Sequence, residues 1–355
     1  NTPYFLAISE NKDATFSPRL YFKNKFLLQT EYRQANMNSN HIADFSYFSK
    51  MGNDSKNHFF YEYDKEFDGK KFNNNKINFK IQRTSNDTYL KADKLESDII
   101  NDTDILENSF GLDLFSDDLS LSLSTNVYED LNKSNNDRYE YELPRIDLVK
   151  NINNRTNLNG NFTFESQALI RNYNTNIYEK TNTNNLIFKS YPIISSNGFY
   201  SDYEFLIKNS NTDSKNSTYK NDENIYLSTL LQYNSSLPLI KKSENYQKIL
   251  KPKISFKLAP THTQNSRDEE TKIDLSNIYS LTRLTDNTTE GGFSVTYGSD
   301  YSIFDNKKSR EILSLKLANN ARFEENDSLS NSNQMGEKTS NLFSEIIFDP
   351  NEFLT

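Results

Sequence analysis

The sequence predicts an all-β protein, and three observations support that prediction. Apolar and polar residues alternate in many short segments, as they do in strands whose two faces meet different surroundings. Apolar residues do not recur at the spacing of an amphipathic helix. The 355 residues are 13% aromatic, which is more than a disordered chain carries. We therefore expect antiparallel strands joined by polar turns.

The first expected element is a β-hairpin within residues 5–33, and its two faces differ in chemistry. The first strand carries the apolar side chains Ala14, Phe16, Leu20 and Phe22 on one face. Folding the chain about Asn24, the centre of a three-residue loop, pairs Arg19 with Gln29. The polar face of the hairpin then consists of Asp13, Thr15, Ser17, Arg19, Gln29, Glu31 and Arg33. A slip of one residue would put Arg19 among apolar side chains, so we expect this register to be well specified.

Further strands are expected wherever the same alternation recurs. The clearest segments are 77–81, 119–123, 162–164, 225–233, 254–258, 293–297 and 313–317. Between them lie stretches rich in asparagine, serine, aspartate and lysine. The two longest, residues 209–224 and 261–272, are expected to be solvated loops.

Composition excludes several classes of function. The net charge of -8 argues against nucleic acid as a partner, because phosphate binding needs a clustered basic surface. The absence of cysteine removes disulfides and thiolate chemistry. His41, His58 and His262 are isolated from one another and are expected to be solvated. We find no metal-binding, cofactor-binding or catalytic motif, so we expect no metal, no cofactor and no enzymatic activity.

Two β architectures fit these observations, a membrane-spanning barrel and a soluble sandwich. A mean hydropathy of -0.83 is too low for one large apolar core. A membrane β-strand needs only about 9 to 11 residues of alternating character. The charged character of the opposite face and the aromatic residues near strand ends favour a large antiparallel transmembrane barrel. Alternation alone does not decide between the two.

Several segments resemble the barrel domain of the LptD family, in the order in which that family places them. The opening resemblance covers residues 3–11, 13–15, Pro18 and 31–33. Residues 83–90 resemble the S-D-x-x-Y-L segment, residues 143–146 resemble L-P-x-I, and residues 341–350 resemble a later barrel strand. The family-motif residues matched in this chain are Asp87, Tyr89, Leu90, Pro144, Asn277, Arg283, Glu290, Gly292, Tyr297 and Gly298.

The chain also departs from the family pattern at two places. Residues 23–25 stand where the family has a glycine in the first hairpin loop. Thr288 or Thr289 replaces the second arginine of the R-x-x-G-x-D-R-x-E-x-G segment, which puts an ion pair between that position and Glu290 in question. The resemblance implies that residues 1–355 are part of the barrel. The preceding periplasmic domain, the first and last strands and the closing C-terminal strands are expected to lie outside this fragment.

By resemblance, the expected function is lipopolysaccharide transport to the outer leaflet of the Gram-negative outer membrane through a laterally opening barrel. The partners so implied are lipopolysaccharide, an LptE-like plug lipoprotein inside the barrel, and an LptA-like periplasmic bridge protein reached through the N-terminal domain. Pro3 matches prolines that weaken the lateral gate, because proline cannot donate to a β-ladder. The polar face of the hairpin would line the lumen. The alternatives are a secreted Asn-rich β-domain, as in an adhesin or surface layer, and a porin-like channel for small solutes.

Overall fold

The computed structural model describes residues 2–21, 25–50, 55–267, 269, 272–329 and 333–349. Nineteen of the strands in this part of the chain belong to one sheet, and every strand pair whose register is resolved is antiparallel. The helical elements are one turn of α-helix, α1 (Tyr89–Ala92), and one of 3-10 helix, η1 (Asn135–Arg138). The predicted all-β, antiparallel class is confirmed. No helix here is both long enough and apolar enough to cross a membrane.

The chain divides into two compact units. The first comprises residues 1–150, 166–182 and 212–217, and the second comprises residues 151–165, 183–211 and 218–355. The first unit contains β1 (Tyr4–Ser9), β2 (Lys12–Tyr21), β3 (Lys25–Ala35), β4 (Ser39–Lys50), β5 (Lys56–Phe67), β6 (Asn75–Thr84), β7 (Ile105–Phe115) and β8 (Leu119–Asp130). The second contains β12 (Ile193–Ile194), β14 (Glu223–Ser236), β15 (Leu239–Lys242), β16 (Tyr246–Ala259), β17 (Gln264–Asn265), β18 (Thr288–Thr289), β19 (Gly292–Asp305), β20 (Arg310–Arg322) and β21 (Phe343–Phe348). Both units include residues of β9 (Tyr139–Ile152), β10 (Gly160–Tyr173), β11 (Ile177–Ser190) and β13 (Tyr200–Lys215).

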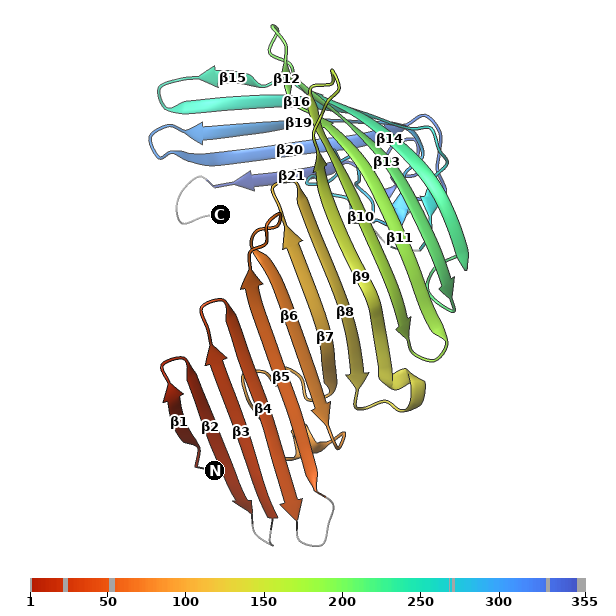
Figure 1. Ribbon diagram of the computed structural model, residues 1–355. Coiled ribbons are helices and arrows are strands. Elements are labelled where there is room, and N and C mark those ends of the chain that lie inside the picture. Colours follow the sequence, from red (N-terminus) through yellow and green to blue (C-terminus); the bar gives the residue numbers. More distant parts are fainter. Residues whose placement is uncertain are drawn as a thin grey trace. The chain divides into compact units, whose positions relative to one another are not determined.

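Within each unit, strands that follow one another along the chain lie side by side (Figure 1). In the first unit, β1 to β9 pair in sequence order. In the second unit, β14, β16, β19, β20 and β21 do the same, with β15 as a short additional partner of β16. This meander places the side chains of neighbouring strands in rows across each face of the sheet.

The predicted β2–β3 hairpin forms, but the predicted register is wrong by two residues. Arg19 pairs with Leu27 rather than Gln29, and Asp13 lies opposite Arg33. A shift of two residues preserves the faces, because side chains alternate with a period of two. It also places opposite charges across the ladder, with Arg33 Nε 3.0 Å from Asp13 Oδ1. The expected loop at residues 23–25 lies mainly outside the described residues.

The two faces of the strands differ in both exposure and polarity, and β14 shows this most plainly. Its exposed face carries Ile225, Leu227, Leu231 and Tyr233, with Ile225 79% and Leu227 62% exposed. Its other face carries Tyr226, Ser228, Leu230 and Gln232, all of which are buried. We call the exposed, mainly apolar side the outer face and the buried side the covered face. On β4, Phe45 and Tyr47 likewise lie on the outer face, and Asp44 and Ser46 on the covered face.

The covered faces are buried because chain segments between strands pack onto them. The first internal segment, residues 85–104 between β6 and β7, contributes Leu90, Leu95 and Ile99 to a core that includes Leu27 and Phe60 of the strands. Full burial of each such side chain contributes about 1.5–3 kcal/mol. The apolar core of the first unit therefore lies on the same face as its polar side chains.

The second internal segment, residues 272–291, lies between β17 and β19 in the chain, includes β18, and packs on the covered face in the same way. Leu281 contacts Leu206, Leu230 and Ala259 of the strands. A neighbouring cluster contains Ile273, Ile278, Ala318 and Met335. Residues 209–224 and 261–272 were expected to be solvated loops. The first expectation is wrong for residues 209–215, which belong to β13 and alternate between covered and half-buried positions.

We expect a charge on the outer face to be strongly destabilising if that face meets lipid. Replacing Leu227 by arginine should then lower the free energy of unfolding by roughly 2–4 kcal/mol, the cost of such a charge near the middle of a bilayer. Denaturant titration of protein folded into lipid vesicles measures this difference.

The matched control is Asn245→Arg in the exposed turn between β15 and β16. It should change the free energy of unfolding by no more than about 0.5 kcal/mol. Equal effects of the two substitutions would mean that the outer face of β14 is solvated by water.

Candidate functional site

The second internal segment is held to the covered face by side chains that donate to its backbone. Gln232 Nε2 on β14 donates to the carbonyl oxygen of Tyr279 at 2.6 Å. Lys257 Nζ on β16 donates to the carbonyl oxygens of Ser280 and Leu281 at 2.9 and 2.8 Å. Two neighbouring strands thus satisfy three consecutive carbonyl groups, which otherwise would be buried without partners.

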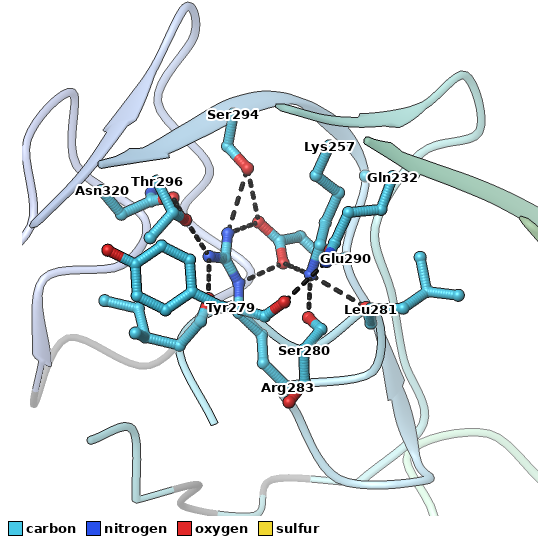
Figure 2. Close-up of polar contacts among 12 residues, drawn as sticks. Gln232, Lys257, Tyr279, Ser280, Leu281, Arg283, Glu290, Ser294, Thr296 and Asn320 are labelled. Atoms are coloured by element: carbon cyan, nitrogen blue, oxygen red, sulfur yellow. Dashed lines mark hydrogen bonds and ion pairs between the residues drawn. The ribbon is translucent and has the colours of Figure 1, made fainter. Parts of the chain in front are cut away.

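Arg283 forms the centre of the site (Figure 2). Its Nε and Nη2 donate to the two carboxylate oxygens of Glu290 at 2.9 and 2.6 Å. Its Nη1 donates to Thr296 Oγ1 at 2.9 Å, and its Nη2 also donates to Ser294 Oγ at 3.0 Å. This two-point pairing fixes both distance and orientation, so it ties the middle of the segment to its C-terminal end, and Arg283 also ties the segment to β19.

Two further cations surround the same carboxylate. Arg322 on β20 donates to Glu290 Oε1 and to the carbonyl oxygen of Gly291. Lys257 Nζ lies 3.5 Å from Glu290 Oε2. None of these four side chains is more than 4% exposed. Two guanidinium groups and one amino group thus surround a single carboxylate, and we call these four side chains the Glu290 cluster.

The environment of Glu290 keeps its carboxylate ionised. Burial alone would raise the pKa of this carboxyl, but the charges of Arg283 and Lys257 and the hydrogen bonds from Arg283 hold it well below its usual range. Arg322 therefore supplies a second arginine for Glu290, although Thr288 or Thr289 stands where the family pattern has one. Alternation alone places Lys257 and Arg322 on the polar side of their strands. The sequence spacing does not indicate that Lys257 and Arg322 approach Glu290, which is distant from both in the chain.

The glycines of the matched motif allow the segment to lie against β19. A Cβ atom on Gly298 would be 2.0 Å from the carbonyl oxygen of Leu317 and 2.6 Å from the hydroxyl of Tyr279. Gly292 has a φ angle of +85°, a conformation that favours glycine. Asn277 closes the preceding turn, because its Nδ2 donates to the carbonyl oxygen of Lys272 at 2.9 Å.

In the first unit, the matched residues of the first internal segment have distinct structural roles. Asp87 accepts two hydrogen bonds from the guanidinium of Arg138 on η1, at 2.6 and 2.9 Å, and this lowers the pKa of the Asp87 carboxyl. Tyr89 and Leu90 are fully buried in the core. Burial raises the pKa of Tyr89 to about 12, and its hydroxyl lies 2.8 Å from Ser46 Oγ.

His58 contradicts the expectation of solvated histidines, since it is only 2% exposed. Its Nδ1 lies 2.5 Å from Ser46 Oγ, and its Nε2 lies 3.4 Å from Asp44 Oδ2. These are the residue types of a nucleophilic triad. Asp44 is 0% and Ser46 3% exposed, so no substrate reaches the serine hydroxyl. The sequence could not indicate that this histidine, on β5, is buried against β4 and Tyr89.

The polar residues expected on the β2–β3 hairpin lie on the covered face, where three of them contact the first internal segment. Arg19 Nη1 donates to the carbonyl oxygens of Asp93 and Lys94 at 2.8 and 2.9 Å. Gln29 Nε2 donates to that of Glu96 at 3.1 Å. Arg33 Nη1 donates to Asp98 Oδ2 at 3.5 Å. The remaining members share that face, since Asp13 lies opposite Arg33, Thr15 opposite Glu31 and Ser17 opposite Gln29.

Three sequence-predicted residues lie apart from both internal segments. Pro3 directly precedes β1 and is exposed. Pro144 lies within β9, opposite a register irregularity in β8. Tyr297 is 47% exposed on the outer face of β19. Across the part of the chain that the structure describes, no group of three or more acidic or histidine side chains could hold a metal ion.

The chemistry of the two strand faces defines the class of protein. Exposed apolar faces combined with buried polar ones are typical of a β-protein that crosses a membrane with its strands. The LptD family, described as LPS transport system D, matches residues 56–355, and the chain belongs to that family. The barrel class and the outer-membrane location expected from the sequence are thereby confirmed.

Two individual proteins were also found to be similar. The LPS-assembly protein LptD of Pseudoalteromonas atlantica (strain T6c / ATCC BAA-1087) is 30% identical over 147 residues, which is 41% of this chain and 19% of that protein. The chain thus matches about a fifth of the length of that relative. A solved bacterial polysaccharide outer membrane secretin shares 10% identity over 84% of each chain, with a TM-score of 0.24. Similarity this low carries no argument about fold or function.

Removal of the Glu290 charge should release the second internal segment. Glu290→Gln leaves three buried cations without a carboxylate, so we expect the free energy of unfolding to fall by roughly 3–5 kcal/mol. We also expect trypsin to cleave after Arg283, which the folded protein buries. Denaturant titration and mass spectrometry of the tryptic fragments measure the two effects.

The matched control is Glu345→Gln, which removes the half-exposed ion pair with Lys316 between β20 and β21. It should cost less than about 1 kcal/mol and leave the bond after Arg283 protected. Protection of that bond in Glu290→Gln as well would contradict the anchoring role of Glu290.

Proposed function

We propose that this chain is part of a conduit that delivers lipopolysaccharide to the outer leaflet of the outer membrane. In this proposal no bond is made or broken, so the protein is a transporter and not an enzyme. The observation that carries the proposal is the match of residues 56–355 to the family described as LPS transport system D. The separation of an apolar outer face from a polar covered face supports it.

The proposed mechanism follows from the amphipathic character of the cargo. The sugar and phosphate groups need a wet, polar route, whereas the acyl chains need an apolar one. The covered faces would line the first route, including Asp13, Thr15, Ser17, Arg19, Gln29, Glu31 and Arg33 of the β2–β3 hairpin. A permanently closed barrel would not let the polar part and the acyl chains take separate routes, because every strand is hydrogen-bonded to the next. A seam that opens between the first and last strands would allow the two parts to travel together.

Pro3 is the proposed weak point of that seam. Proline has no backbone N–H, so it cannot donate to a partner strand. It directly precedes β1, all six residues of which are exposed. Within the described residues, the register of β1 shows pairing with β2 alone, and that pairing is irregular between Ala7 and Ser9. A weakly held strand near the start of the barrel domain would favour such a lateral opening.

The remaining partners belong to the same proposal. A plug lipoprotein similar to LptE would occupy the lumen, and a bridge protein similar to LptA would deliver lipopolysaccharide through a periplasmic domain that precedes residue 1. Residues 1–355 would be one part of the barrel domain, and further strands after residue 355 would complete it. The family match gives no support to a secreted Asn-rich domain or to a porin-like channel.

Depletion of the full-length parent protein tests the proposed function. We expect newly made lipopolysaccharide to disappear from the cell surface and to accumulate inside, because its route outward is lost. Pulse-labelling followed by capture with a surface-applied antibody measures the surface fraction. Unchanged surface lipopolysaccharide would favour an adhesin, and a change confined to small-solute uptake would favour a porin.

The gate proposal has a separate test in Pro3→Ala. A restored N–H that adds one ladder hydrogen bond of about 0.5–1.5 kcal/mol should slow export by roughly two- to tenfold. The rate at which labelled lipopolysaccharide reaches the surface is the measurement. Pro238→Ala, between β14 and β15, is the matched control and should export at the unmodified rate. Equal rates in all three proteins would reject the role of Pro3.

A further inference from the structure

A groove on the covered face of the second unit adjoins the anchoring contact between Gln232 and Tyr279. It lies beside residues 275–279 of the second internal segment and is bordered by β13, β14 and β16. Its lining includes Tyr200, Asp202, Asn234, Lys251, Lys253 and Tyr279. The cavity volume is about 270 Å³, close to the lower end of the range of about 300–1,000 Å³ typical of small-ligand sites.

One wall of the groove is a fixed chain of hydrogen bonds. Asn234 Nδ2 donates to Asp202 Oδ1 at 2.8 Å. Gln232 Nε2 donates to Asn234 Oδ1 at 3.0 Å and to the carbonyl oxygen of Tyr279 at 2.6 Å. Because each amide is oriented by the next, the carboxylate of Asp202 is held in place before any ligand arrives.

The other wall combines ammonium groups with aromatic rings. Lys251 Nζ lies 6.0 Å from the ring centroid of Tyr200, and Lys253 Nζ lies 5.5 Å from that of Tyr279. Lys253 also forms an ion pair with Asp300 of β19. Lys251 makes no ion pair with any residue that the structure describes, so its charge remains available to an anion.

The surroundings of the groove add positive charge. Tyr279 directly precedes Ser280, whose carbonyl oxygen accepts from Lys257 of the Glu290 cluster. That cluster places Arg283 and Arg322 against the single carboxylate of Glu290, and its members are at most 4% exposed. Buried charge is screened by salt much less than surface charge. Asp300 offsets the charge of Lys253 and Asp202 adds a negative charge to the opposite wall, so the buried arginines favour an anionic group beside Lys251.

We propose that this groove binds a phosphorylated saccharide, the chemistry of the polar part of lipopolysaccharide. The proposal rests on the proposed function and assigns one place along the polar route. Lys251 would pair with phosphate, as lysine does elsewhere, and Lys253 would donate a further hydrogen bond to it beside its ion pair with Asp300. Asp202 would accept from sugar hydroxyl groups, and the rings of Tyr200 and Tyr279 would contact the C–H faces of the sugar. A bare phosphate would use only the lysines, and an acyl chain would leave the polar wall unpaired.

The test uses the full-length protein and three soluble probes. The first is phosphorylated oligosaccharide released from lipopolysaccharide by complete deacylation, the second is the same oligosaccharide after phosphatase treatment, and the third is inorganic phosphate. Isothermal titration measures the affinity for each. We expect the first probe to bind at least tenfold more tightly than either of the others, because it alone engages both walls.

Two substitutions locate the binding. Lys251→Gln and Asp202→Asn should each weaken binding of the phosphorylated oligosaccharide by roughly three- to tenfold. Lys248→Gln, on the exposed opposite face of the same strand β16, is the matched control and should bind as the unmodified protein does. Unchanged far-UV circular dichroism and an unchanged unfolding midpoint would show that the variants remain folded. Equal affinities for Lys251→Gln and Lys248→Gln would overturn the proposal.

A photo-crosslinking amino acid separates failure of the groove from failure of transport. Placed at Ser236, which lines the groove, it should crosslink to lipopolysaccharide in cells that are exporting it. Crosslinking at Thr15 on the hairpin but not at Ser236 would reject the groove and retain the transport function. No crosslink at either position, with normal surface lipopolysaccharide after depletion, would reject both.

Discussion

The constraint on which this structure depends is that each strand has only one face on which protein can pack. The outer faces carry exposed apolar side chains such as Ile225 and Leu227, so they add nothing to a protein core. A core can form only on the covered faces, and the chain builds it there with two internal segments. Leu90 and Leu281 supply the apolar contacts, and backbone carbonyl groups receive donors from the strands. The internal segments therefore stabilise the sheet and shape its polar side at once.

The two segments are held by different chemistry. The first combines a large apolar cluster around Tyr89 and Leu90 with the Asp87–Arg138 pair at its start. The second has smaller apolar clusters and depends on the Glu290 cluster. The burial of this carboxylate with its three basic partners carries a desolvation cost, and removal of one partner strongly destabilises the folded protein. Such a cluster specifies one position for the segment, whereas apolar packing alone would tolerate several.

Period-two alternation made the strands and their faces predictable, because each face has a single chemical character. It assigned the covered side of the β2–β3 hairpin correctly despite an error of two residues in register. The length of the turn sets the register of a hairpin, and the sequence indicates turn length less clearly than it indicates alternation. The internal segments were not predictable as packed elements, since residues 85–104 and 272–291 are polar and show no regular period. Burial of His58 and the approach of Arg322 to Glu290 depend on contacts between distant parts of the chain. The family motif identified Arg283, Glu290 and Gly298, and the structure shows how each of them holds the second internal segment in place.

Arg322 lies on β20, outside the contiguous stretch in which the motif is written, and yet it completes the surroundings of Glu290. The functional unit of this part of the molecule is therefore a discontinuous one. A chimera that imports residues 272–291 from a relative carrying both arginines within the motif would bring a fourth cation next to one carboxylate. Grafting in either direction would succeed only if residue 322 were exchanged together with the segment, so the two form one module for protein engineering.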